Sequence, residues 1–285
     1  MSAVIVVAGP TASGKTAFGI ELALQRNGEI VSADSMQIYR GMDIGTAKAT
    51  PEEQAAVRHH MIDIADPAED YSVAAYVNDA AACCEEILSR GKIPVITGGT
   101  GLYIDSLLSG RDFGDSEQSG ELRAELSARY DELGGEEMLR RLSEFDPERA
   151  ARLAPADRKR IVRAFEVYIL TGETITAHDR KTRELPPRYE AEVHVLGMTD
   201  REALYRRIDS RVDAMFAQGL EAEVSSLLTH VPSTATAMQA IGYKEVAAAL
   251  RGEMTMEEAK ELIKMSSRRY AKRQMTWFRK YEVRI

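Results

Sequence analysis

The chain has 285 residues, of which 44% are hydrophobic, and a formal net charge of −8. This composition is that of a globular protein with one large or two moderate domains. No apolar stretch approaches the ~20 residues that a membrane-spanning helix needs, and no basic leader precedes the first apolar run. We therefore expect a cytoplasmic protein rather than a membrane-embedded or secreted one.

The first half of the sequence alternates between strand and helix patterns. Short runs rich in Val and Ile predict strands, and longer runs with helical spacing predict helices. In chain order these are a strand at 3–8, a helix at 14–26, a strand at 29–33, a helix at 72–90 and a strand at 93–97. The alternation predicts an α/β fold with a parallel sheet, whose ligands bind beyond the carboxyl ends of the strands. Within the long helix, the adjacent Cys83 and Cys84 suit neither a disulfide nor a metal site, and we expect both to be buried.

The pattern changes after residue 110. A polar stretch at 111–120 is followed only by helical patterns, up to a Pro-Pro linker at 186–187. The run at 192–198 then predicts a return to the sheet, and the remainder is predicted to be helical, with a last helix at 256–281. We therefore expect an α/β core formed by residues 1–111 and 189–285, and a helical insertion domain at 112–188.

Charge is distributed unevenly along the chain. Residues 260–285 hold nine Lys or Arg against two Glu, a net charge of +7, so the remaining residues carry −15. A basic helix on an acidic protein is either a solvated face or a surface for a polyanion. We expect Arg268, Lys272 and Arg273 to contact nucleic-acid phosphates.

The first strand leads into a complete G-x-x-x-x-G-K-[ST] pattern. Its residues are Gly9, Pro10, Thr11, Ala12, Ser13, Gly14, Lys15 and Thr16. Successive backbone N–H groups and the following helix N-terminus bind phosphate oxygens in such loops, while Lys15 adds a point charge and Thr16 a ligand for Mg²⁺. The sequence thus predicts a P-loop NTPase-like core, but the loop alone does not specify the chemistry.

Polar residues also follow the second and third strands. Asp34 comes directly after the second strand, where a carboxylate serves as a magnesium ligand, as a general base, or simply as a turn residue. Ser35 and Gln37 beside it could read a purine edge. After the third strand stands a glycine-rich segment with Thr100, and no carboxylate appears before Asp105. This departure argues against an ordinary NTPase, and the glycines permit either a tight turn or a close approach.

Seven segments in this order resemble bacterial tRNA dimethylallyltransferases over almost the whole chain. They lie at 9–16, 32–39, 43–48, 59–63, 98–103, 239–244 and 272–279. The resemblance implies transfer of a dimethylallyl group from dimethylallyl diphosphate to N6 of the adenosine 3′-adjacent to the tRNA anticodon, with release of diphosphate. It implies Mg²⁺ as cofactor and the anticodon stem-loop of tRNA as partner, and we expect a monomer.

The resemblance also assigns roles to residues. Asp34 is our candidate for the base that takes the N6 proton, Thr100 for orienting the adenosine, and Lys15 for stabilising the departing diphosphate. In the helix at 201–211 we expect Arg207 to meet the diphosphate, with Arg211 as the alternative. The expected tRNA-binding residues are Asp34, Ser35, Met36, Gln37, Thr100, Arg123, Lys159, Arg160, Arg163, Gln239, Gly242, Lys244, Arg268, Lys272 and Arg273.

Three other functions stay open at this stage. A small-molecule phosphotransferase would use the same loop for ATP, but it gives no reason for the basic helix. An adenylate isopentenyltransferase would use free AMP or ATP as acceptor, and the helical insertion favours tRNA instead. A noncatalytic tRNA-binding protein would leave the phosphate loop without a purpose.

Overall fold

The computed structural model describes residues 3–110, 120–197 and 200–281. They form two compact units, one of residues 1–108 and 188–285 and the other of residues 109–187. The predicted domain boundary at 111–112 and the end of the run predicted at 192–198 lie outside the described residues. Among the described helices, none combines the length and apolar character needed to cross a membrane.

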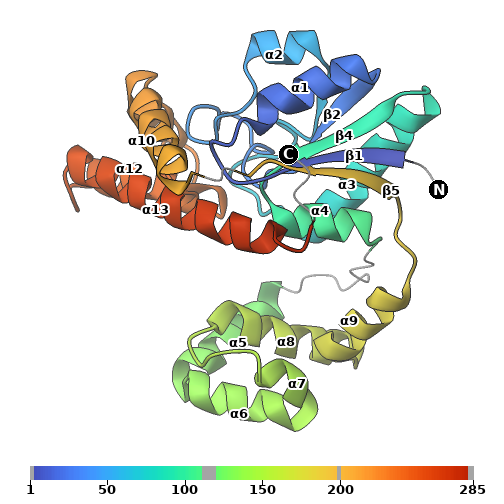
Figure 1. The fold of residues 1–285 in the computed structure, drawn as a ribbon. Helices are drawn as coiled ribbons and strands as arrows, with labels where there is room; N and C mark the ends of the chain where they lie inside the picture. The colour runs from blue at the N-terminus through green and yellow to red at the C-terminus, as the bar shows by residue number, and fades with distance from the viewer. Residues whose placement is uncertain (1–2, 111–119, 198–199, 282–285) are drawn as a thin grey trace. The chain divides into compact units, whose positions relative to one another are not determined.

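Unit 1 is built on a five-stranded parallel sheet (Figure 1), which confirms the predicted α/β fold. Its strands are arranged in the order β3-β2-β4-β1-β5, and their bounds are Ala3–Ala8 (β1), Gly28–Ser32 (β2), His59–His60 (β3), Ile93–Gly98 (β4) and Glu190–Val195 (β5). β1 pairs with β4 on one side and with β5 on the other. The central strands are buried on both faces, which explains why they read as continuous apolar runs.

Helices cover both faces of this sheet (Figure 1). α1 (Lys15–Gln25) and α2 (Pro51–Ala56) lie on one side, and α3 (Val73–Ser89) and α4 (Gly101–Leu108) lie on the other. Four further helices and a 3₁₀ turn gather at the carboxyl ends of the strands. They are α10 (Arg201–Ala217), α11 (Leu220–Leu227), η1 (Ala237–Gln239), α12 (Tyr243–Leu250) and α13 (Met256–Phe278). The sequence did not predict α2, α4 or β3.

Unit 2 is helical in its described part. Its elements are α5 (Gly120–Leu133), α6 (Gly135–Phe145), α7 (Pro147–Ala150), α8 (Arg158–Thr171) and α9 (Ile175–Glu184). Leu142, Ala150 and Ala164 form its apolar centre, against which Phe145 and Phe165 pack. It therefore has a small core of its own, to which α9, not predicted from the sequence, also contributes.

The two cysteines differ in their surroundings. Cys84 is fully buried, as expected, but Cys83 is only half-buried, with its Sγ 3.9 Å from Met61 Sδ. Burial raises the pKa of both thiols, so neither has the low pKa of a reactive cysteine.

A charged cluster surrounds the buried Glu29 at the amino end of β2. The Glu29 carboxylate is 2% exposed and accepts hydrogen bonds from Arg90 (2.5 and 2.7 Å) and Lys92 (2.8 Å), and it lies 2.7 Å from His60 Nε2. The bonds from Arg90 hold the Glu29 pKa well below its usual range, although burial acts in the opposite direction. His60 thus belongs to a structural cluster, and no group of metal-ligating side chains occurs among the described residues.

We expect Glu29→Gln to lower the free energy of unfolding by about 1.5–3 kcal/mol, because it removes the charged acceptor of the hydrogen bonds from Arg90 and Lys92. Urea unfolding measures the loss. Because the folded-state pKa is lowered, the contribution of Glu29 is present at neutral pH and disappears as pH falls below the ordinary carboxyl range. Glu192→Gln, which removes exposed pairs with Arg26 at 2.8 Å and with His194 at 2.7 Å, is the control and should cost about 1 kcal/mol or less. Equal losses in the two variants would contradict the argument.

Candidate active site

The phosphate loop connects β1 to α1. Gly9 and Gly14 have φ angles of 147° and 92°, in the region that favours glycine. A Cβ on Gly9 would also lie 2.4 Å from the carbonyl oxygen of Leu196, at the end of β5. No side chain caps the N-terminus of α1. The loop therefore leaves backbone N–H groups of the first helical turn available to an anion.

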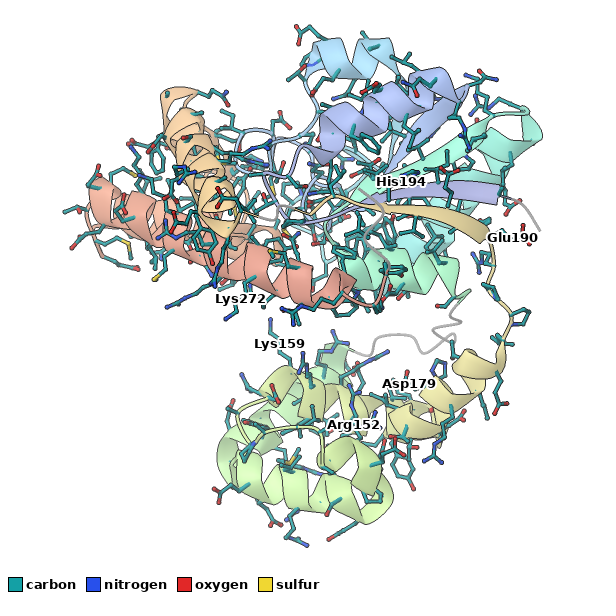
Figure 2. All side chains as sticks on the ribbon, viewed as in Figure 1. Arg152, Lys159, Asp179, Glu190, His194 and Lys272 are labelled. Atoms are coloured by element: carbon teal, nitrogen blue, oxygen red, sulfur yellow. The ribbon has the colours of Figure 1, made fainter. Side chains whose placement is uncertain are left out.

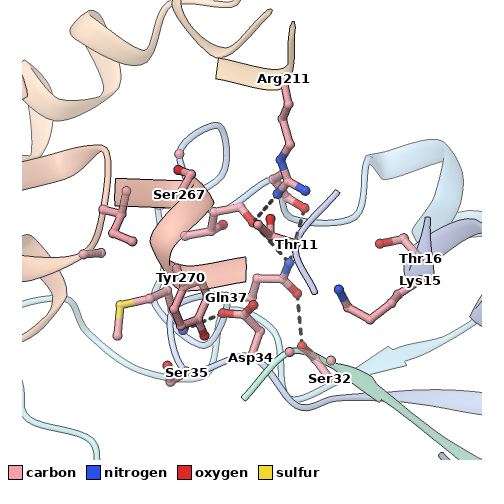
Figure 3. Close-up of a pocket in the computed structure, with 18 of the residues that line it drawn as sticks. Thr11, Lys15, Thr16, Ser32, Asp34, Ser35, Gln37, Arg211, Ser267 and Tyr270 are labelled. Carbon is pink, nitrogen blue, oxygen red and sulfur yellow. Dashed lines mark hydrogen bonds between the residues drawn. The ribbon is translucent and has the colours of Figure 1, made fainter. Parts of the chain in front are cut away.

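A cavity of about 490 Å³ opens beside this loop, within unit 1 (Figure 3). The phosphate loop, the segment after β2, the end of β4 and helices α10 and α13 all contribute to it. Its polar lining residues include Thr11, Lys15, Thr16, Ser32, Asp34, Ser35, Gln37, Thr97, Arg211, Gln239, Lys244, Ser267, Tyr270, Arg273 and Gln274. Residues predicted separately from three parts of the sequence thus line one cavity.

Lys15 and Arg211 are the cations next to the loop. Lys15 Nζ donates to the Pro10 carbonyl oxygen at 2.6 Å. Burial and the positive charge of Arg211 lower the pKa of Lys15 to about 7, while Asp34 opposes them. Burial also lowers the pKa of Arg211. Since a bound anion would relieve this repulsion, the site is electrostatically prepared for phosphate groups.

Asp34 forms a turn and also lines the cavity. Its Oδ1 accepts the amide N–H of Met36 at 2.9 Å, which fixes a turn after β2. The same carboxylate lines the cavity. Its negative charge partly opposes the lowering of the pKa values of Lys15 and Arg211, and it adds to the raised pKa of Tyr270. Asp34 is therefore a negative group among cations and hydroxyls, with the turn fixing its backbone.

Two buried hydroxyls near the loop have no protein partner. They are Ser13 Oγ and Thr97 Oγ1. Buried polar atoms are normally satisfied. Thr97 lines the main cavity, where a polar ligand could supply its missing partner, whereas Ser13 lies within the phosphate loop. Thr16 lines the same cavity, and its hydroxyl, with Asp34 nearby, fits a Mg²⁺ ion held mainly by phosphate and water oxygens.

Thr100 holds the segment after β2 in place. Its Oγ1 accepts the amide N–H of Ser35 at 3.1 Å, and its own amide donates to the carbonyl oxygen of Ala33. Gln37 is also engaged, because its Oε1 accepts from Ser32 and its Nε2 donates to the carbonyl oxygens of residues 46 and 47. Gln37 therefore shapes the cavity wall rather than offering a free amide to a purine.

The glycines after β4 permit close approach by protein. A Cβ on Gly98 would lie 2.2 Å from the Ala33 carbonyl oxygen, and one on Gly101 would lie 2.3 Å from the Trp277 ring. Gly101 is the first residue of α4, so this segment begins a helix. The close approach comes from Ala33, just after β2, and from α13.

Comparisons with known proteins identify the family. The family model described as IPP transferase matches residues 37–281. A tRNA dimethylallyltransferase from Acetivibrio thermocellus is 48% identical over 284 residues, covering 99% of this chain and 90% of the relative. One from Symbiobacterium thermophilum is 49% identical over 277 residues, covering 97% and 86%. The chain belongs to the IPP transferase family.

Solved structures agree with this assignment. The tRNA isopentenylpyrophosphate transferase of Bacillus halodurans superposes with a TM-score of 0.72 at 40% identity, covering 99% of this chain and 88% of that one. A eukaryotic dimethylallyltransferase acting on tRNA gives a TM-score of 0.83 at 29% identity, covering 98% and 70%. The predicted family and the P-loop-like fold are thereby confirmed.

Arg207 and Arg211 of this IPP transferase differ in the cavities that they line. Arg207 is exposed, lies over Gly14 and lines a second, open cavity of about 580 Å³, whereas Arg211 lines both cavities. The Arg211 guanidinium also donates to the carbonyl oxygen of Thr46 at 3.4 Å. Of the two arginines only Arg211, first considered as the alternative, lines the main cavity together with Asp34, whose charge acts on it (Figure 3).

The remaining expected tRNA-binding residues of unit 1 differ in environment. Gln239, Lys244 and Arg273 are exposed at the rim of the main cavity. Gly242 precedes α12 with a φ of 102°. Lys272 is exposed on α13 (Figure 2), whereas Arg268 is bound to Asp209 of α10 at 2.5 Å. Arg268 therefore helps to hold α13 against α10.

In unit 2 the expected tRNA-binding residues form two sets. Arg123 and Arg163 both donate to Oε2 of Glu166, at 2.9 and 2.8 Å, and Glu166 is fully buried. Lys159 and Arg160 are exposed in the first turn of α8. Arg123 and Arg163 thus neutralise a buried carboxylate, while the other two are open to solvent.

Sequence reasoning missed Tyr270 and Gln274, which line the cavity from α13. Burial raises the pKa of Tyr270 to about 12, although hydrogen bonds with Thr100 and Gln274 lower it. The signal was their spacing of four residues, which puts both on one face of α13. The interpretation of this helix assigned site roles only to its Lys and Arg residues.

Proposed function

We propose that this transferase moves a dimethylallyl group from dimethylallyl diphosphate to N6 of the adenosine 3′-adjacent to the tRNA anticodon. The observation that carries the proposal is the cavity in which the phosphate loop, Arg211 and Asp34 face one another. Ile208, Val212 and Met215 of α10 add an apolar wall that suits a dimethylallyl group. Because tRNA is the proposed acceptor, we place the enzyme in the cytoplasm.

The diphosphate would lie on the loop, with the amides of the first turn of α1, Lys15 and Arg211 around it. As the allylic C–O bond breaks, its electron pair stays on the diphosphate oxygen, and these donors stabilise the charge that develops there. Mg²⁺, held through Thr16 and phosphate oxygens, would supply further positive charge when bound. The phosphate loop would thus stabilise diphosphate as the leaving group.

The acceptor amine needs a base, because the adenine ring withdraws its lone pair. N6 forms the new C–N bond to the allylic carbon and gives its proton to a carboxylate oxygen of Asp34. Thr100 acts on this step by holding Ser35, next to Asp34. Contacts inside the cavity would offset the free energy that is needed to flip the adenosine out of its stack.

Incorporation of labelled dimethylallyl diphosphate tests the function, with Mg²⁺ and either unmodified tRNA or AMP as acceptor. We expect label on N6 of the adenosine beside the anticodon. Label on AMP would redirect the assignment to an adenylate isopentenyltransferase. No label on either acceptor would overturn the proposed transfer.

We expect Lys272→Glu to weaken tRNA binding and to reduce the salt dependence of log K, with dimethylallyl diphosphate binding unchanged. Removing one phosphate contact lowers the salt slope by about one. Arg26→Glu is the control, since Arg26 caps the far end of α1, away from the loop. Equal effects of the two charge reversals would show that only net charge matters.

A further inference from the structure

Gln274 connects two loops of the cavity that are far apart in the sequence. It lies near the end of α13 and is 5% exposed. Its Oε1 accepts the amide N–H of Thr11 in the phosphate loop at 2.9 Å, and its Nε2 donates to the carbonyl oxygen of Gly99 at 2.9 Å. The oxygen of one side-chain amide thus binds the phosphate loop, and its nitrogen binds the segment after β4.

The packing around Gln274 leaves little room for another arrangement. A Cβ on Gly99 would lie 2.1 Å from Gln274 Nε2. Four residues earlier on α13, Tyr270 forms a hydrogen bond with Gln274. The amide is therefore fixed by a neighbour on its own helix and by the close approach of Gly99.

Other contacts hold α13 on the segment after β4. Asp105 of α4 accepts from Trp277 Nε1 at 2.9 Å and from the Tyr281 hydroxyl at 2.5 Å, and it also binds Lys280. Gly101 lets the Trp277 ring pack closely on α4. Since these contacts remain when Gln274 is replaced, loss of its amide need not detach the helix.

We propose that Gln274 is a positioning residue that sets the phosphate loop relative to the adenosine side of the cavity. Gly99 precedes Thr100, which holds Ser35 and hence the Asp34 segment. A path of hydrogen bonds and peptide bonds therefore runs from Thr11 through Gln274, and then through the Gly99–Thr100 and Ser35 segments, to the carboxylate of Asp34. The inference rests on the proposed function, because the path matters only if the diphosphate leaves on one side while N6 attacks from the other.

Gln274→Met tests this path, because methionine has a similar length but makes neither hydrogen bond. We expect the single-turnover rate of transfer to fall by about 10²-fold, the cost of a misplacement of ~1 Å. The dissociation constants of tRNA and of dimethylallyl diphosphate should each change less than about threefold, because a pure positioning effect is expressed in the rate. Loss of both affinities in parallel with the rate would instead indicate a structural role and overturn the proposal.

Gln274→Glu gives a sharper readout. An ionised carboxylate can accept from Thr11 but cannot donate to Gly99, whereas a protonated carboxyl can do both. The rate of this variant relative to the unsubstituted enzyme should therefore rise as pH falls. Gln25→Glu, on the exposed face of α1, is the matched control and should give a flat ratio. A flat ratio for Gln274→Glu as well would overturn the proposal.

Amide hydrogen exchange separates this inference from the proposed function. In Gln274→Met the Thr11 amide should exchange faster, whatever reaction the cavity catalyses, since it loses its acceptor. Unchanged exchange at Thr11 would overturn the inference. Faster exchange together with no transfer to tRNA by the unsubstituted enzyme would keep the connection between the loops and remove the proposed function.

Discussion

Asp34→Asn should slow the single-turnover rate of prenyl transfer by about 10²–10⁴, the range typical for loss of a general base. Asparagine retains an oxygen that can accept the Met36 amide, so the turn after β2 is preserved. What it loses is the capacity to take a proton from N6. Rapid-quench measurement with enzyme in excess over tRNA isolates this step from product release, and tRNA affinity should change little.

Asp66→Asn is the matched control for this substitution. Asp66 makes the same kind of turn, with its Oδ1 accepting the amide of Ala68 at 2.9 Å, but it does not line the cavity. Its rate should equal that of the unsubstituted enzyme. If Asp34→Asn also left the rate unchanged, Asp34 would be only a turn residue.

Lys15→Met should lower the transfer rate by about 10²–10³, as expected when one donor to a developing oxyanion is removed. It should also change how substrate affinity depends on pH. With a pKa of about 7 in the free enzyme, Lys15 is largely neutral at pH 8. A bound diphosphate favours the charged form, so binding above pH 7 takes up a proton, and affinity falls by up to about tenfold per pH unit.

Calorimetry in buffers of different ionisation enthalpy measures this proton uptake. At pH 8 we expect close to one proton per dimethylallyl diphosphate bound by the unsubstituted enzyme, and close to none by Lys15→Met. Lys181→Met, which removes an exposed lysine paired with Glu173 in unit 2, should behave as the unsubstituted enzyme. Equal uptake in all three proteins would show that the proton goes elsewhere.

Much of the fold was predictable because its signals are local. A strand such as β1 is a run of apolar residues ended by Gly9, and the phosphate loop follows it directly. β3 has only two residues, too few for any periodicity to appear. The six-residue α2 depends on a capping box at Thr50 that lies outside any long apolar pattern. Short elements held by tertiary contacts therefore escaped prediction.

The lining of the cavity was predictable where its residues belong to a local motif, and less so where two distant segments of the chain contact each other. Asp34 and Lys15 line the cavity as their positions after the strands indicated. The partner of Gly99, in contrast, lies 175 residues further along the chain, so no local pattern reports it. Arg207 and Arg211 differ by one helical turn, and only the packing of α10 distinguishes their surroundings.

The place of β5 in the sheet has a consequence for synthesis on the ribosome. β1 lies between β4 and β5, yet the whole of unit 2 is translated between those two strands. Until β5 emerges, one edge of β1 stays unpaired for on the order of ten seconds at usual elongation rates. That edge belongs to an apolar strand, the kind of edge that pairs with other chains. The nascent protein thus passes through a stage at which early release or stalling exposes it to aggregation.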